Sequence, residues 1–355
     1  MRFFVQMCCC ILLAASLQAQ SIDDKLRFAS SEMQSLDSVR KQLAQKIEHL
    51  KLLQIQEKLD AAGLPAVANG EQLVRHAAYS LCYAEKFEQA RWVAHMIVPD
   101  VVKGTVFRTN DFRPDPLVQT GSAVEEDYFL KRMKPDSSWE YDAFGYDRGH
   151  LAPSADFRWS SIALSESYFY SNMSPQLADF NRGAWGDLED AIRAYLYTHP
   201  NTALYVVTGP VLKDGLPVIP RAKHKVAIPQ QYFKAVVDLQ NKNAIGFIMP
   251  NQLITQPLHT FAVSINDIEQ LTGLNLFNKI PAALQNELEV MKDAVSWLPV
   301  ASQADVAPVP QQSLRRNHFN TTVAKQWMGH ADAVSVCGRV VGARLSRGGN
   351  VLLNL

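Results

Sequence analysis

The most regular pattern of apolar and polar positions lies near the start of the chain, from about Ser21 to Ala62. Apolar residues recur there every three or four positions, with Lys, Glu and Gln between them: Leu36, Val39, Leu43, Ile47, Leu50 and Leu53. This spacing predicts one long amphipathic helix, so we interpret residues 20–65 as a helical arm. The stripe suits a coiled-coil or packing role, and the pattern leaves open whether it forms a homodimer with a second copy or lies on its own domain.

Short apolar segments bounded by turn residues begin near Arg75 and predict the strands of a globular domain over residues 75–297. They are Tyr79–Tyr83, Trp92–Ile97, Tyr168–Met173, Ala203–Val207 (ended by Thr208-Gly209-Pro210), Phe233–Asp238 and Ala244–Met249. Helical spacing occurs over Asn181–Tyr197, Ser264–Leu271 and Ala282–Trp297. Runs of strands with segregated helices favour an α+β fold over alternating βαβ units.

The composition changes near the end of this domain. Residues 298–315 are rich in Pro, Ala, Val and Gln, which predicts a linker. Residues 316–355 form a short β tail, with a strand pattern from Asp332, a turn at Arg347–Asn350 and a second short strand. Two strands bury no core of their own, so the tail is either part of a small OB-like domain or a hairpin on the main body.

Residues 1–19 have the composition of a secretory signal peptide. Arg2 supplies the positive charge, Phe3–Leu13 is mostly apolar, and Ala14–Ala19 is small enough for cleavage. The apolar run is too short to span a bilayer, and no later run approaches that length, so we expect a secreted or periplasmic protein without membrane contact. A lipoprotein is the weaker alternative, because the cysteines at positions 8–10 lie too early and lack the usual preceding small residues.

The remaining composition is that of an ordinary globular protein, with 355 residues, 47% hydrophobic and 20% charged. Of five cysteines, Cys82 and Cys337 remain after the predicted signal, and their separation argues against a cysteine zinc site. The compartment permits a disulfide between them, but the sequence does not indicate one. The 35 basic and 35 acidic residues balance, and removal of Arg2 leaves a net charge of −1. A polyanion would therefore be bound by a local cluster of charge.

The densest group of chemically active residues lies in Tyr146–Phe157, which contains the run Asp-Arg-Gly-His. The neutral imidazole of His150 can accept a proton from water near neutral pH, and the guanidinium of Arg148 can neutralise an oxyanion. Gly149 permits a close backbone approach that a side chain would forbid. Taken alone, an ordinary loop with an ion pair between Asp147 and Arg148 explains this run equally well.

The helix predicted over Asn181–Tyr197 supplies complementary groups. Glu189 and Arg193 are four residues apart and share a face, while Asn181 lies about 80° from Glu189 on an ideal helix. One edge of the helix should therefore carry an amide oxygen, a carboxylate and a guanidinium. Taken alone, the Glu-Arg pair is more often a solvated pair without a catalytic role.

Together these motifs resemble the DNA/RNA non-specific endonuclease family, which includes secreted bacterial nucleases and endonuclease G. The resemblance covers roughly residues 79–274 and rests on Asp147–Pro153, Ser171–Gln176, Asn181–Glu189 with Arg193, Thr208–Pro210 and Val226–Pro229. It implies a ββα-metal (His-Me finger) nuclease core within a larger mixed sheet. The implied substrates are DNA and RNA, cleaved with little sequence preference because the contacts fall on phosphates.

By this resemblance, His150 is the general base, and Asn181 is the only direct protein ligand of a Mg²⁺ ion, for which Mn²⁺ can substitute. Glu189 holds the water molecules of the metal, a reasonable arrangement because Mg²⁺ gives up its water reluctantly. The implied reaction is in-line attack of water on phosphorus. The metal stabilises the departing 3′ oxygen and supplies its proton through bound water, and the product carries a 5′-phosphate.

The resemblance also implies that three arginines face the phosphate and its developing charge: Arg148, Arg193 and Arg108. Arg113 competes with Arg108 for this position. Asn172 would orient the loop or the substrate, and Asp147 would support the motif.

A non-catalytic nucleic-acid-binding protein on the same scaffold is the alternative, because the tail resembles the opening strands of an OB-fold. His150, Asn181 and Glu189 argue against it, since a pure binder does not need them. The sequence contains no Gly-x-Ser-x-Gly elbow, no Gly-Lys-Ser/Thr phosphate loop and no His-Glu-x-x-His. Other histidines lack ligand spacing and are expected to be structural or exposed, among them His76, His95, His224 and His259.

Overall fold

The computed structural model describes residues 21–298, 309–315, 318–327, 334–338, 342–345 and 351–354. The predicted signal peptide and most of the predicted linker lie outside these residues. The chain divides into two compact units, Met1–Leu53 and Gln54–Leu355.

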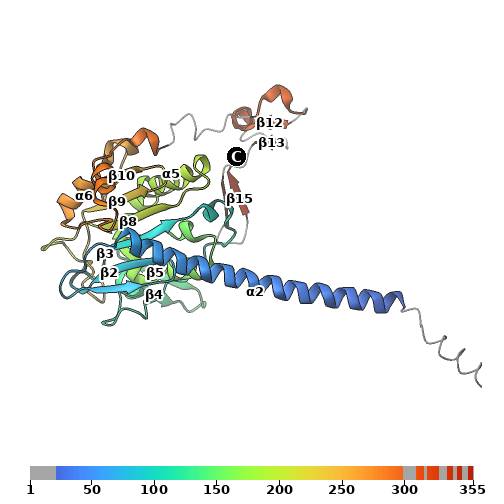
Figure 1. Cartoon of the computed structure of the whole chain (residues 1–355), viewed down its shortest axis with the longest axis horizontal. Helices are drawn as coiled ribbons and strands as arrows, with labels where there is room; N and C mark the ends of the chain where they lie inside the picture. Colours follow the sequence, from blue (N-terminus) through green and yellow to red (C-terminus); the bar gives the residue numbers. More distant parts are fainter. Residues whose placement is uncertain are drawn as a thin grey trace, which may run out of the picture. The chain divides into compact units, whose positions relative to one another are not determined.

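A single helix, α2 (Ile22–Ala62), occupies the range predicted for the arm (Figure 1). Asp23 and Asp24 lie in its first turn, where carboxylates interact favourably with the helix dipole. The six apolar side chains of the stripe are exposed, from 48% for Val39 to 69% for Leu36. The part of α2 that follows the stripe belongs to the second unit, where Ile55 and Leu59 are buried in the core. Pairing of the stripe with a second copy stays a prediction.

Seven strands form the central sheet of the second unit, and Figure 1 shows its middle strands side by side. In order across the sheet they are β1 (Gln72–Arg75), β2 (Tyr79–Ala84), β3 (Gln89–Ile97), β8 (Leu204–Pro210), β9 (Gln231–Asp238), β10 (Asn243–Pro250) and β11 (Ala262–Val263). Every neighbouring pair is antiparallel. The prediction of a mixed sheet is therefore wrong. Short turns join β1, β2 and β3, and also β9 and β10, as hairpins, and the long segment between β3 and β8 returns in the opposite direction.

The other elements of the second unit are shorter. The helices are α3 (Ser161–Glu166), α4 (Ala178–Asn181), α5 (Ala184–Thr198), α6 (Ile265–Thr272), α7 (Ala282–Glu289) and α9 (Thr321–Ala324). Two-stranded sheets pair β4 (Phe129–Met133) with β5 (Trp139–Ala143), β6 (Asp147–His150) with β7 (Met173–Gln176), β12 (His318–Asn320) with β13 (Ser335–Cys337), and β14 (Gly342–Leu345) with β15 (Val351–Asn354).

Alternation of side chains gives the central sheet two buried faces. On one face, Trp92 and Phe233 pack in a cluster with the end of α2, with α6 and with α7. On the other face, Lys234 lies against Trp185 of α5, and the neighbouring strand contributes Thr208. Burial on both faces explains why these strands are nearly continuous apolar runs in the sequence.

Two predicted elements differ from the structure. The strand predicted over Tyr168–Met173 is a turn and a short 3-10 helix, η5 (Tyr170–Asn172), and strand β7 begins only at Met173. The backbone of residues 168–172 forms hydrogen bonds with Arg113 and within its own turn, instead of with a neighbouring strand along its whole length. The helix predicted over Ala282–Trp297 ends at Glu289, and the Asp293 side chain caps a separate 3-10 turn.

In the tail, β14 and β15 pair antiparallel, and the strand pattern that begins at Asp332 corresponds to β13 instead of to the first strand of this hairpin. The tail also contains a parallel pair, β12 and β13. Cys82 is buried, Cys337 is partly exposed, and both are free thiols. Within the described ranges, no helix has the length and apolar character needed to cross a membrane.

Candidate active site

The paired strands β6 and β7 carry the Asp-Arg-Gly-His run. Gly149 lies opposite Ser174, and a Cβ atom on it would be 2.1 Å from Oε1 of Gln176, so the close packing of this pair requires glycine. Because side chains alternate along a strand, Arg148 and His150 share one face of β6.

His150 lies in an aromatic environment, with its ring centroid 5.1 Å from that of Tyr168 and 5.7 Å from that of Phe112. Its Nε2 atom is buried and has no hydrogen-bond partner among the described residues. Burial, followed by the positive charges of Arg108 and Arg148, lowers the pKa of His150 from 6.5 to about 3. The imidazole is therefore neutral near pH 7, which is the form that can accept a proton.

Arg148 is held in place by rings beside His150. Its Cζ atom lies 3.7 Å from the centroid of Phe112 and 5.0 Å from that of Phe129, and Nη1 donates to the Tyr170 hydroxyl at 3.4 Å. Stacking of this kind orients a guanidinium while its edge stays available to an anion.

Arg108 and Arg113 differ in how many protein groups bind their guanidinium groups. Arg113 pairs with Asp111 at 2.7 Å, donates to the Ser165 carbonyl at 2.9 Å and stacks on Phe169 at 4.1 Å. Arg108 is exposed, its Nε donates to a neighbouring side chain, and its charge acts on His150. The structure thus favours Arg108 over Arg113 as the second arginine of the site.

The predicted helix over Asn181–Tyr197 is broken, which corrects the expected placement of Asn181. Helix α4 ends at Asn181 and α5 begins at Ala184, with Gly183 between them at φ −102° and ψ −120°. A Cβ atom on Gly183 would lie 2.5 Å from the carbonyl oxygen of Asp179, so a glycine permits the break. Asn181 is therefore not on the helix of Glu189, and the ideal-helix angle does not apply.

Asp147 ties the end of α4 to β6. Its Oδ2 accepts a hydrogen bond from Nδ2 of Asn181 at 3.0 Å, and Arg182 pairs with both of its oxygens at 2.6 and 2.7 Å. The amide nitrogen of Asn181 is thereby fixed, and within the described ranges no donor bonds its Oδ1. This is the oxygen that the resemblance assigns to a metal.

Glu189 lies on the buried side of α5 near a cation that the sequence analysis missed. Its Oε1 is buried and has no hydrogen-bond partner in the described part of the chain. Lys234 is 2% exposed, donates to Oγ1 of Thr208 at 2.8 Å and lies 4.9 Å from the Trp185 ring. Burial raises the pKa of Glu189, and the charge of Lys234 is the strongest opposing influence. The only sequence signal was a lone lysine inside the apolar run Phe233–Asp238.

Arg193 does not present a free guanidinium. It donates to Asp156 at 2.6 Å and also pairs with Asp190, and its side chain is 16% exposed. Asp156 in turn bonds Nε2 of the buried His95 at 2.8 Å. Arg193, which was expected to face the phosphate, is thus paired with the buried carboxylate of Asp156. His95 is buried and structural, as expected.

Asn172 is fully buried and bonds only backbone groups among the described residues. Its Oδ1 accepts from the Ala152 amide at 2.9 Å, and its Nδ2 donates to the carbonyls of Ala152 at 2.9 Å and Ser167 at 2.8 Å. Of the two roles implied by the resemblance, this geometry fits orientation of the loop after His150.

No cluster of three or more His, Cys, Asp or Glu side chains suited to a metal ion occurs in the described ranges. A cation that keeps most of its water needs no such cluster. The unbonded oxygens of Asn181 and Glu189 fit a single direct ligand and an acceptor for metal-bound water, respectively.

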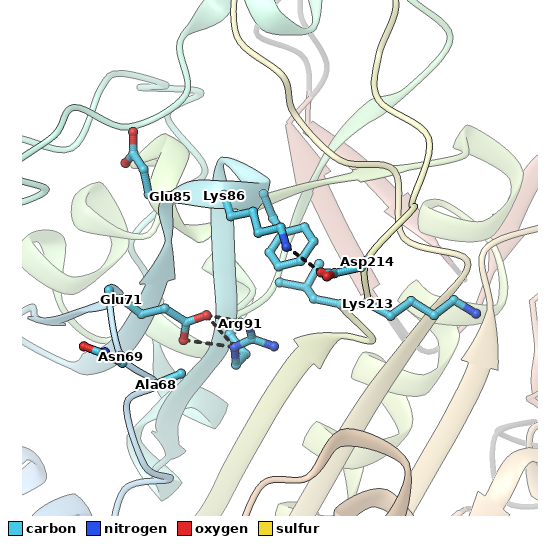
Figure 2. Close-up of a pocket in the computed structure, with 11 residues that line it drawn as sticks. Ala68, Asn69, Glu71, Glu85, Lys86, Arg91, Lys213 and Asp214 are labelled. Atoms are coloured by element: carbon cyan, nitrogen blue, oxygen red, sulfur yellow. Dashed lines mark hydrogen bonds and ion pairs between the residues drawn. The ribbon is translucent and has the colours of Figure 1, made fainter.

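A separate pocket of about 320 Å³ lies away from these residues. Figure 2 shows two ion pairs among its charged residues, Arg91 with Glu71 and Lys86 with Asp214. None of the candidate catalytic residues lines it.

Comparisons with known proteins identify the family of this chain. Residues 58–283 match the model of the DNA/RNA non-specific endonuclease family. The chain is 32% identical over 226 residues to mitochondrial endonuclease G from Bos taurus, covering 60% of this chain and 70% of that protein. It is 30% identical over 227 residues to a nuclease from Nostoc sp., covering 61% and 76%.

A structural relative supports the same conclusion. The crystal structure of the EndoG/EndoGI complex contains a similar chain, with a TM-score of 0.53 and 27% identity over 65% of this chain and 94% of that one. The protein is therefore a hydrolase that belongs to the DNA/RNA non-specific endonuclease family.

Proposed function

We propose that the chain is a secreted or periplasmic, metal-dependent endonuclease that hydrolyses phosphodiester bonds in DNA and RNA without regard to base sequence or sugar. The observation that carries this proposal is the neutral His150, whose buried Nε2 has no partner among the described residues and lies in the positive field of Arg108 and Arg148. The order β6, β7, α5 supports a ββα-metal core. The signal-like composition of residues 1–19 supports export.

Arg148 and Arg108 bind the phosphodiester in this mechanism. The negative charge of the substrate offsets the positive field that lowers the pKa of His150, so the imidazole becomes a stronger base when the substrate is bound. His150 then takes a proton from water as the water oxygen attacks phosphorus in line with the 3′ oxygen. The bond to the 3′ oxygen breaks, that oxygen takes a proton from a water molecule to become a hydroxyl, and the product keeps a 5′-phosphate.

Asn181 and, through water, Glu189 would hold a hydrated Mg²⁺ or Mn²⁺ ion, and that ion would stabilise negative charge on the departing 3′ oxygen. Asp147 fixes the Asn181 amide so that its oxygen is the group presented. Lys234 lowers the pKa of Glu189 and so favours the carboxylate form that can accept bonds from water. Phosphate contacts explain a lack of sequence preference, because they carry no base information.

The double variant His150→Ala with Asn181→Ala tests this function. It should lose cleavage of a plasmid and of an RNA transcript while keeping the wild-type circular dichroism spectrum, and His259→Ala at an exposed histidine should remain active. A chelator should stop wild-type cleavage, and added Mg²⁺ should restore it. Undiminished cleavage by the double variant would refute the assignment. Binding of nucleic acid without any cleavage by the wild type would support the non-catalytic alternative.

A further inference from the structure

The hairpin of β4 and β5 exposes an unusual row of side chains. Its register places Lys131 opposite Tyr141 and Met133 opposite Trp139, and residues opposite each other in a pair lie on the same face. Trp139 is 45% exposed, Tyr141 57% and Met133 63%. Large apolar side chains grouped on an exposed face often mark a binding surface.

Contacts within this row give it the character of an aromatic surface with one cation. The Lys131 ammonium lies 4.5 Å from the Trp139 ring and 5.9 Å from the Tyr141 ring, and the Tyr141 ring is 5.6 Å from that of Phe129. We call these four residues, Phe129, Lys131, Trp139 and Tyr141, the aromatic face.

The aromatic face is continuous with the candidate active site. The Phe129 ring is 5.0 Å from the Arg148 guanidinium, which stacks on Phe112 at 3.7 Å, and Phe112 in turn contacts His150. A ligand that reaches from the aromatic face to His150 therefore passes over Arg148.

The charges of the hairpin favour an anionic occupant on this face. Lys131 is its only charged residue, because Glu140 and Asp142 lie at alternate positions that point to the opposite side. Arg221 pairs with Asp142 at 2.6 Å, so that carboxylate is also neutralised.

We infer that the aromatic face is a subsite for unpaired nucleotides next to the scissile phosphate, with bases stacked on Trp139 and Tyr141 and a phosphate paired with Lys131. This subsite rests on the proposed function and names the form of nucleic acid that the site takes. Stacking accepts any base, in keeping with cleavage that ignores sequence, but it requires bases that are not paired in a duplex. The subsite therefore favours single strands over duplexes of the same sequence.

The cleavage test compares a long and a short substrate. The variant Trp139→Ala with Tyr141→Ala should lower the ratio of kcat/KM for a single-stranded oligothymidylate to kcat/KM for bis(p-nitrophenyl) phosphate by roughly tenfold or more, since base stacking contributes about 1–3 kcal/mol per base. The short diester has no nucleobase to stack on Trp139 or Tyr141 and no second phosphate to pair with Lys131. Tyr197→Ala, at an exposed tyrosine of α5, should leave this ratio at the wild-type value. An unchanged ratio in the double variant would overturn the inference.

A binding test works even if the chain cleaves nothing. With chelator present, the anisotropy of a labelled oligothymidylate should report a Kd roughly tenfold higher for the double variant. For Lys131→Met, log Kd should depend less steeply on log salt, by about one phosphate contact. Wild-type binding with no cleavage after Mg²⁺ is added would refute the proposed function and leave the subsite standing, whereas equal Kd values for the wild type and the double variant would refute the subsite.

A gentler substitution controls for disturbance of the hairpin. Binding of the oligonucleotide should quench the fluorescence of exposed Trp139, and Trp139→Phe, which keeps a ring in the hairpin, should remove that quenching while retaining most of the affinity. Quenching of equal size in Trp139→Phe would show that the bases do not stack on this ring.

Discussion

His150 should make the folded protein less stable in mild acid, and the size of this effect follows from its surroundings. Its pKa is lowered from 6.5 to about 3 by burial and by two arginines. Between these values the unfolded chain binds a proton at this imidazole and the folded chain does not, so stability falls as the pH decreases below about 6.5. At pH 5, about 1.5 units below the ordinary pKa, the loss is about 2 kcal/mol at about 1.4 kcal/mol per unit.

The substitution His150→Asn isolates this effect. Urea unfolding of the wild type and the variant at pH 7.5 and pH 5.0 gives the loss of unfolding free energy for each, and the wild type should lose about 2 kcal/mol more than the variant. The packing cost of the substitution is the same at both pH values and cancels, as do contributions from the other histidines. Equal losses in the two proteins would refute the reasoning, because they would mean that His150 titrates alike in the folded and unfolded chains.

Three further substitutions test how the site is supported. Gly183→Ala should destabilise the fold by about 1–3 kcal/mol and reduce cleavage, because its Cβ meets the Asp179 carbonyl; thermal unfolding and a plasmid assay check this. Asp147→Asn should lower activity about 10–100-fold and weaken the apparent affinity for Mg²⁺, because Asn181 loses the carboxylate that fixes its amide. Activity titrated against Mg²⁺ measures both. Lys234→Met should reduce kcat/KM about tenfold at pH 7, because loss of the Lys234 charge raises the pKa of Glu189 further. The deficit should shrink toward pH 9, where Glu189 is again a carboxylate. A deficit that is constant with pH would argue against this last account.

The parts of the site that are local in sequence could be predicted. The candidate residues from Asp147 to His150 are consecutive in the sequence, and they lie together on strand β6. The central strands coincide with short apolar runs in the sequence. The close packing that Gly149 permits also follows from residue chemistry. The supporting role of Asp147 came from the resemblance, and its partners Asn181 and Arg182 lie 34 and 35 positions away in the chain.

Contacts between distant segments could not be predicted. Arg193 lies four residues after Glu189, which suggested a pair on one helix, but its strongest partner in the structure is Asp156, 37 positions away in the chain. The helix break at Gly183 was equally hidden, because a glycine within a helical pattern is compatible with a continuous helix or with a break. Only the position of the Asp179 carbonyl decides between them.

The buried charges under α5 indicate why Glu189 differs from its neighbours. Asp156 is satisfied by Arg193 and His95, and Lys234 by Thr208. Among the described residues, Glu189 is the only one with a buried carboxylate oxygen that lacks a hydrogen-bond partner. Leaving such an oxygen unbonded costs about 1–3 kcal/mol or more, so a stable fold tolerates it where another molecule completes the bond. In the proposed mechanism, water held by a metal at Asn181 would supply that donor, and this would account for the unbonded oxygen of Glu189.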